Sequence, residues 1–149
     1  QRCNSLAPLV KRVPLAPGYR LPTEAEWEYT ARANSDFRYS GSDSLDEIAW
    51  YHRNSEKSTH PVGQKKANAY GINDMSGNVW EWCWDWHAEY GHQRVVDPVG
   101  PDRGGSRIIR GGSWDFGNGG GRVSNRNRGM PGEASPYIGL RLARTIVHP

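Results

Sequence analysis

The sequence lacks any apolar run approaching 18 residues and shows no signal-peptide core, so it predicts no transmembrane helix and a soluble domain. Cysteine is also scarce, since Cys3 and Cys83 are the only two. Two cysteines so far apart do not form a disulfide framework; they could pair in an exported protein, although buried free thiols fit better. The length of 149 residues suits one domain with a real core.

Lysine is missing from the C-terminal third, and acidic residues are few there. Residues 103–149 hold 8 arginines against 2 acids, a net charge of +6, whereas residues 1–102 hold 11 basic and 14 acidic side chains, a net charge of −3. Arginine forks can engage phosphates, but no base-stacking or groove-reading motif accompanies these. We therefore expect structural arginines and no nucleic-acid partner.

Tryptophan is abundant, and seven indoles argue against disorder because each must be covered by other groups. Four of them alternate along the chain: Trp80, Trp82, Trp84 and Trp86. This period of two predicts a strand with the indoles on one face. The opposite face would carry Val79, Glu81, Cys83 and Asp85. Because other large apolar residues are few, the tryptophan face is predicted to form the core.

A helix is predicted from about Glu24 to Ala33. Thr23 and Glu26 have the spacing of a capping box, in which each side chain accepts a hydrogen bond from the other residue's backbone N–H. Trp27 and Ala31 lie one turn apart on its inner face.

The remainder of the chain indicates short strands between long irregular loops. Residues 34–73 show no periodicity, and residues 107–114 read as a strand that ends at a glycine pair. Residues 115–137 are rich in glycine and small polar side chains, and residues 138–144 read as a closing strand. Long loops in a compact domain often carry binding residues.

Four segments carry a family resemblance: GYRLPTEAEWEYTARA at 18–33, NAYGINDMSGNVWEWCWDW at 68–86, RIIRGGSW at 107–114 and IGLRLAR at 138–144. In this order they resemble the formylglycine-generating enzyme, or sulfatase-modifying factor, family. The resemblance implies an α+β, C-type lectin-like fold of the formylglycine-generating enzyme type, loop-rich with short antiparallel strands. Residues 1–149 would then be a single domain that forms the C-terminal part of a longer formylglycine-enzyme-like domain.

The enzymes of this family oxidise a substrate cysteine with O2, using copper held by two cysteines after the GGSW-like motif. Thiolates are the ligands that this chemistry requires. Here Phe116 holds the first cysteine position, and no cysteine follows Cys83. We therefore expect no catalytic residues, no copper and no enzymatic activity. A formylglycine-generating oxidase with thiols from a partner, or a degenerate family member, is the alternative. A sugar-binding lectin is a further one, although its EPN and QPD tripeptides are absent.

The resemblance is stronger to the variable proteins of diversity-generating retroelements, in particular the spirochaete type. Residues 107–144 look like their variable region, and residues 115–137 have the composition expected of rewritten asparagine codons. This implies a cell-surface or extracellular protein that binds a macromolecular ligand, expected to be a protein, with no membrane insertion by this segment. The predicted ligand-binding residues are Asp115, Phe116, Gly117, Asn118, Gly119, Gly120, Arg128, Gly129, Met130, Gly132, Ser135, Pro136 and Tyr137.

The family resemblance also implies a calcium site within DMSGNVWE. Asp74 and Glu81 would supply carboxylate oxygens, and Gly77 and Val79 would supply backbone carbonyls. Hard oxygen ligands from an irregular loop suit Ca2+. The alternative is an aspartate that caps a turn and a glutamate bonded to backbone.

Overall fold

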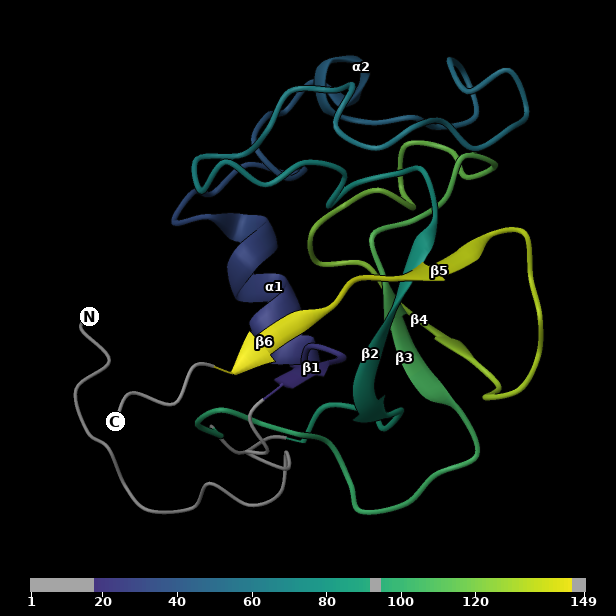
Figure 1. The fold of residues 1–149 in the computed structure, drawn as a ribbon. Coiled ribbons are helices and arrows are strands. Elements are labelled where there is room, and N and C mark those ends of the chain that lie inside the picture. Colours follow the sequence, from purple (N-terminus) through teal and green to yellow (C-terminus); the bar gives the residue numbers. More distant parts are fainter. Residues whose placement is uncertain (1–17, 92–94, 146–149) are drawn as a thin grey trace.

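The computed structural model of the protein describes residues 18–91 and 95–145 (Figure 1). The helices are α1 (Glu24–Arg32) and α2 (Leu45–Ile48). The strands are β1 (Gly18–Arg20), β2 (Trp80–Trp86), β3 (Arg107–Arg110), β4 (Arg126–Gly129), β5 (Ile138–Leu140) and β6 (Ala143–Thr145). This is the loop-rich α+β architecture predicted from the sequence. No helix in the described ranges has the length and apolar character needed to cross a membrane.

The main sheet has the strand order β4-β3-β2-β5, and β1 pairs with β6 in a separate two-stranded sheet. β2 and β4 both run antiparallel to β3, whereas β5 runs parallel to β2. The predicted antiparallel pairing is therefore confirmed for the other described strand pairs, and the pairing of β5 with β2 is parallel. The segment expected to be one closing strand over 138–144 is also divided, since β5 and β6 belong to different sheets.

The predicted helix is confirmed as α1, and its N-terminal cap has both reciprocal bonds. The backbone N–H of Glu26 donates to Thr23 Oγ1 at 3.1 Å, and that of Thr23 donates to Glu26 Oε2 at 2.8 Å. The helix ends one residue earlier than predicted, because Ala33 adopts a left-handed conformation with φ of 45°. Trp27 and Ala31 are buried on the inner face, as expected.

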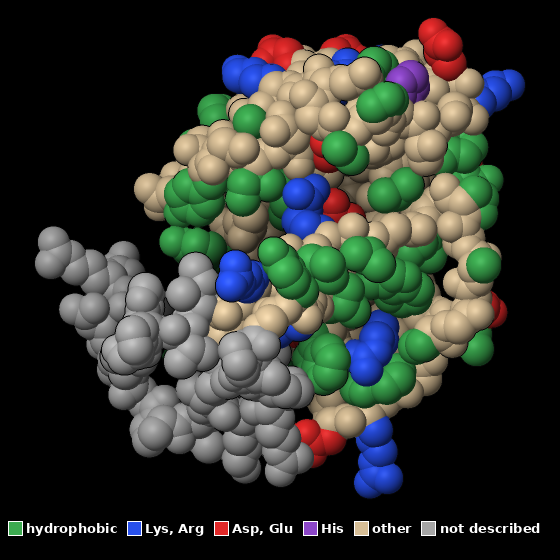
Figure 2. Space-filling model, viewed as in Figure 1, with side chains coloured by type: hydrophobic (Ala, Val, Ile, Leu, Met, Phe, Trp, Pro, Cys, Tyr) green, Lys and Arg blue, Asp and Glu red, His purple; other side chains and the backbone are tan. Residues whose placement is uncertain are grey.

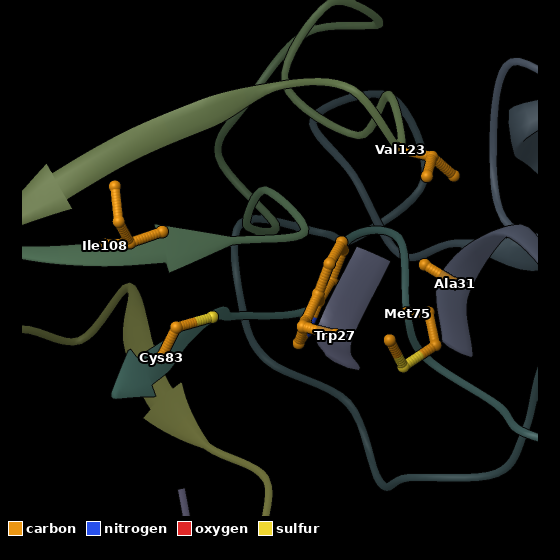
Figure 3. Packing of buried hydrophobic residues seen from close by; sticks show 6 residues of the cluster. All are labelled: Trp27, Ala31, Met75, Cys83, Ile108 and Val123. Carbon is orange, nitrogen blue, oxygen red and sulfur yellow. The ribbon is translucent and has the colours of Figure 1, made fainter. Parts of the chain in front are cut away.

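The main core lies where α1 packs against β2 and β3. Its buried members are Trp27, Ala31, Met75, Cys83, Ile108 and Val123, most of which Figure 3 shows gathered around the Trp27 ring. A second small cluster supports the long loop around α2. Cys83 is free and fully buried, as the free-thiol interpretation expects, while Cys3 lies outside the described residues.

The predicted orientation of β2 is wrong. Glu81, Cys83 and Asp85 are buried, whereas Trp82, Trp84 and Trp86 are only half-buried. The cause is α1, which packs on the face with the carboxylates and supplies them with donors. One example is the backbone N–H of Glu24, which donates to Asp85 Oδ2 at 2.7 Å. Carboxylates that have such partners can be buried where unpaired ones could not.

Candidate ligand-binding surface

The half-buried tryptophan face of β2 supports the surface predicted to bind a ligand. At the start of the strand, the Phe116 ring meets the buried Trp80 indole edge-on, with centroids 5.2 Å apart at 88°. One pleat further along, Gly129 of β4 lies directly on the Trp82 ring, where an added Cβ would come within 2.6 Å of a ring carbon. The tryptophan face of β2 therefore supports Phe116 and Gly129, whereas Arg128 pairs with the buried Ile108 of β3 and so points to the opposite face of the sheet.

Two predicted contact residues that are distant in sequence, Phe116 and Tyr137, both contact Trp80. Tyr137 packs against Trp114 with ring centroids 5.0 Å apart, and the Tyr137 carbonyl accepts a 2.8 Å hydrogen bond from the Trp80 backbone. Phe116 contacts the Trp80 ring. Sequence reasoning treated Trp80 only as core and did not include Trp114 in the surface. The position of Trp114 at the end of the GGSW motif, directly before the predicted surface, was the sequence signal that could have identified it.

Most of the predicted ligand-binding residues are exposed, in line with a contact surface. Phe116 is 42% exposed, Met130 56% and Tyr137 37%. Also exposed are Asp115, Gly117, Asn118, Gly119, Arg128, Gly132 and Pro136. The exceptions are Gly129 and Ser135, which are half-buried, and Gly120, which is buried.

The structure does not place Gly120 on the surface, because it lies beneath Phe116. A Cβ added there would come within 2.6 Å of the Phe116 Cβ atom. A Cβ added at Gly112, whose φ is +80°, would in turn lie 2.8 Å from the Gly120 backbone. The close approach of these two glycines holds the loop that presents Phe116 against the scaffold, and Gly120 is a support residue rather than a contact.

Arginines brace this surface from beneath, as the sequence predicts. Arg110 is fully buried and donates to Glu24 Oε1 at 3.0 Å and to Glu28 Oε2 at 2.5 Å. Arg126 donates to both oxygens of Glu24, at 2.7 and 2.8 Å. In contrast, Arg128 extends from the same strand as Arg126 and is exposed, so its guanidinium can reach a partner.

The four residues predicted to bind calcium line one cavity of about 450 Å3. Asp74 accepts a 2.7 Å hydrogen bond from Gly63 N–H through Oδ2, while Oδ1 is buried without a hydrogen-bond partner. Glu81 already accepts bonds from Trp27 and from Arg141, at distances of 2.7 to 3.2 Å. The Asp74 oxygen fits a cation, whereas any cation at Glu81 would share that carboxylate with Arg141.

Neither Cys83 nor Ser113 is placed for covalent chemistry. Cys83 is fully buried, and burial raises the pKa of its thiol far above the usual range. Ser113 is also buried, and its Oγ has no hydrogen-bond partner that would act as a base. Thiol and hydroxyl nucleophiles need a lowered pKa or an adjacent base, and neither side chain has that environment.

The fold and the exposed, arginine-braced surface define a domain of the formylglycine-generating enzyme type. A family model described as the sulfatase-modifying factor enzyme 1-like domain matches residues 3–146. The chain belongs to this family.

Among similar proteins, the chaperone protein LppX of Paenibacillus barcinonensis is 39% identical over 87% of this chain and 50% of its own length. The formylglycine-generating enzyme of Streptomyces coelicolor is 38% identical over 85% of this chain and 46% of its own. The solved structure of Treponema denticola variable protein 1 has a TM-score of 0.84 and 42% identity, over 87% of this chain and 49% of that one. The chain thus spans about half the length of these relatives.

Proposed function

We propose that this chain is a non-enzymatic ligand-binding domain that presents the exposed side chains of residues 115–119 and 128–137 to a macromolecule, expected to be a protein. The observation that carries the proposal is the separation between that surface and the core. Phe116, Met130 and Tyr137 are exposed, while the arginine pairs and the α1 contacts lie beneath the sheet. Aromatic and arginine side chains dominate interface energetics, so Phe116, Tyr137 and Arg128 are the expected anchors.

Two further observations support this proposal. The structural likeness to Treponema denticola variable protein 1 extends over 87% of the chain. No cysteine follows the GGSW motif, and Cys83 is buried with a raised thiol pKa. Thiolate ligands for copper are therefore missing from the position at which the enzymes of the family carry them.

The competing function is that of a formylglycine-generating oxidase, which the similarity to the Streptomyces coelicolor enzyme favours. An assay of formylglycine formation distinguishes the two functions. The purified protein, copper and a cysteine-bearing sulfatase peptide are incubated with O2, and peptide mass is measured with the Streptomyces enzyme as positive control. We expect unchanged peptide; formylglycine from this chain would refute the proposal.

The retroelement origin has its own test in the DNA around the gene. We expect a template repeat nearly identical to the codons of residues 107–144 and a reverse-transcriptase gene nearby. Differences between the repeat and the gene should be confined to adenines of the repeat. A locus without a repeat would leave residues 115–137 as an ordinary glycine-rich loop.

We also propose that Asp74, with the backbone of Gly77 and Val79 and a share of Glu81, holds Ca2+. The buried Oδ1 of Asp74 supports this, because a bound cation would satisfy it. Calcium should raise the unfolding temperature more than magnesium does, since ligand binding to the folded state stabilises it. Asp74→Asn should remove the calcium shift, whereas Asp36→Asn, at an exposed site, should retain it.

Display at the cell surface or outside the cell is the last part of the proposal, and it rests on the likeness to variable proteins. External protease applied to intact cells should remove the chain while a cytoplasmic marker survives. Protection equal to that of the marker would exclude surface display.

A further inference from the structure

The loop of residues 115–121 carries Asn118, the one asparagine in the sequence that is followed by glycine. The Gly120 N–H donates to the Gly117 carbonyl at 2.9 Å, so Asn118 and Gly119 are the two central residues of a tight turn. The loop runs through the upper right part of Figure 1, where the surface in Figure 2 is mostly backbone and uncharged polar side chains. Asn118 and Gly119 are both exposed, so the centre of the turn is open to water.

This turn is held at its two ends and free at its centre. The Phe116 carbonyl accepts a backbone hydrogen bond at 3.2 Å, and the Gly120 carbonyl accepts one from Asn125 Nδ2 at 3.0 Å. Between them, a Cβ added at Gly119 would meet no atom within 4 Å. Neither the Asn118 side chain nor the Gly119 N–H forms a hydrogen bond with any described residue. These two residues can therefore change conformation without losing a hydrogen bond of their own.

An exposed asparagine before glycine can deamidate without an enzyme. The backbone nitrogen of the glycine forms a bond to the side-chain carbon Cγ, and the amide leaves as ammonia with the proton of that nitrogen. The product is a five-membered succinimide, which water opens. Cleavage of the bond between the nitrogen and Cγ gives aspartate, whereas cleavage of the backbone C–N bond gives isoaspartate. Glycine favours the first step because it has no Cβ and its backbone reaches conformations that other residues avoid.

We propose that Asn118 is a site of spontaneous deamidation, which converts this part of the ligand-binding surface from a neutral to an acidic form. Either product adds one negative charge at neutral pH to a loop that already carries the exposed Asp115. Isoaspartate also inserts Cβ into the backbone of the turn. Because the Phe116 side chain packs on Gly120 at the end of that turn, the longer backbone would displace the ring. The effect on a ligand rests on the proposed function, but the deamidation does not.

Peptide mass assigns the reaction to one residue. The purified chain is kept at neutral pH and body temperature for days, then unfolded and digested with trypsin, with a sample digested at time zero to correct for reaction during digestion. The peptide of residues 111–122 contains Asn118 as its only side-chain amide. The peptide of residues 33–38 contains the exposed Asn34, which precedes serine, and is the control. We expect the mass change from amide to acid in the first peptide only; equal conversion of both would overturn the proposal.

The rate in the folded chain tests whether the turn is open. A synthetic peptide of residues 111–122 is incubated beside the protein under the same conditions. The folded chain should deamidate within about tenfold of the peptide's rate, which corresponds to a barrier raised by at most about 1.4 kcal/mol. A lower rate would show that the fold keeps the Gly119 nitrogen from Asn118 and would reject the site.

Two matched variants identify the attacking nitrogen. Gly119→Ala adds a methyl group to the attacking residue, in open space, and should slow deamidation by at least about tenfold. Gly117→Ala, where an added Cβ also meets no atom within 4 Å, should leave the rate unchanged. Thermal unfolding shows that each variant folds. Equal rates in the parent and both variants would rule out attack by Gly119.

The effect on the surface has a separate readout. Phe37 and Phe116 are the only two phenylalanines, so NMR of the chain labelled at phenylalanine rings follows Phe116 directly. New Phe116 resonances should grow at the rate of the mass change, while those of Phe37 stay constant. Unchanged Phe116 resonances in the deamidated chain would overturn the displacement of the ring. None of these measurements uses a ligand, so their failure is distinct from failure of the proposed function.

Discussion

The indole Nε1 of Trp27 donates a 2.7 Å hydrogen bond to Oε2 of Glu81, and both side chains are buried between α1 and β2. The same carboxylate accepts from Arg141, which follows β5 in the chain. One glutamate therefore joins the helix, the central strand and the segment that closes the sheet. Phe116 and Gly129 pack on the opposite, tryptophan face of β2, so this part of the ligand-binding surface is supported by a pairing on the other side of the strand.

Glu81→Gln tests that role. The amide can still accept from Trp27, but it loses the charge that pairs with Arg141, whose side chain is 31% exposed. Breaking a fully buried pair costs about 3–5 kcal/mol, and partial exposure lowers this to about 2 kcal/mol. Urea unfolding should show that loss, while Glu89→Gln at an exposed position should change little. Equal stability of the two variants would show that the pair contributes nothing.

Arg110→Lys should cost more, because Arg110 is fully buried. Its guanidinium donates hydrogen bonds to Glu24, to Glu28 and to the Val123 carbonyl at the same time. A lysine ammonium cannot span those acceptors, so at least one buried carboxylate loses its partner. We expect a loss of about 3 kcal/mol in the free energy of unfolding. Arg128→Lys, on the exposed part of β4, is the matched control and should stay within about 0.5 kcal/mol of the parent.

These pairings explain how far the sequence could predict the structure. The capping box of Thr23 and Glu26 and the burial of Trp27 are local patterns, and each is confirmed. The orientation of β2 was not predictable, because alternation alone favours burying tryptophan over glutamate. The reversal depends on partners distant in sequence: α1, whose Glu24 N–H and Trp27 indole donate to Asp85 and Glu81, and Arg141, which is 60 residues from Glu81. Likewise, composition marked residues 115–137 as a surface, but only the packing on Phe116 shows that Gly120 is buried.

Asp85 should make stability depend on pH. Burial raises the pKa of its carboxyl from an ordinary 3.8 to about 6. Between these values the folded state binds more protons than the unfolded state, so this group's contribution to stability falls as pH rises from about 4 to 6. Asp85→Asn removes the titration and can still accept from Glu24 N–H. Relative to the parent, the variant should therefore be more stable at pH 7 than at pH 4, by about 2 kcal/mol.

Unfolding free energies measured at several pH values, and compared as differences between variant and parent, isolate this group. The contribution of Glu26 to stability instead rises with pH, because the hydrogen bond from Arg20 lowers the pKa of its carboxyl. This contribution is the same in variant and parent, so it cancels in the comparison. A flat difference for Asp85→Asn would show that the Asp85 carboxyl does not titrate at the raised pKa.

The ligand-binding surface should tolerate substitution where the scaffold does not. Arg128→Ser and Met130→Ser replace exposed side chains, and each should change the free energy of unfolding by less than about 0.5 kcal/mol. Gly112→Ala should cost more than about 1 kcal/mol, because its φ is +80° and its Cβ would meet the Gly120 backbone. Urea unfolding of the three variants gives the comparison. If the serine variants cost as much as Gly112→Ala, these exposed residues belong to the scaffold, and the separation of surface from core on which the proposed function rests is wrong.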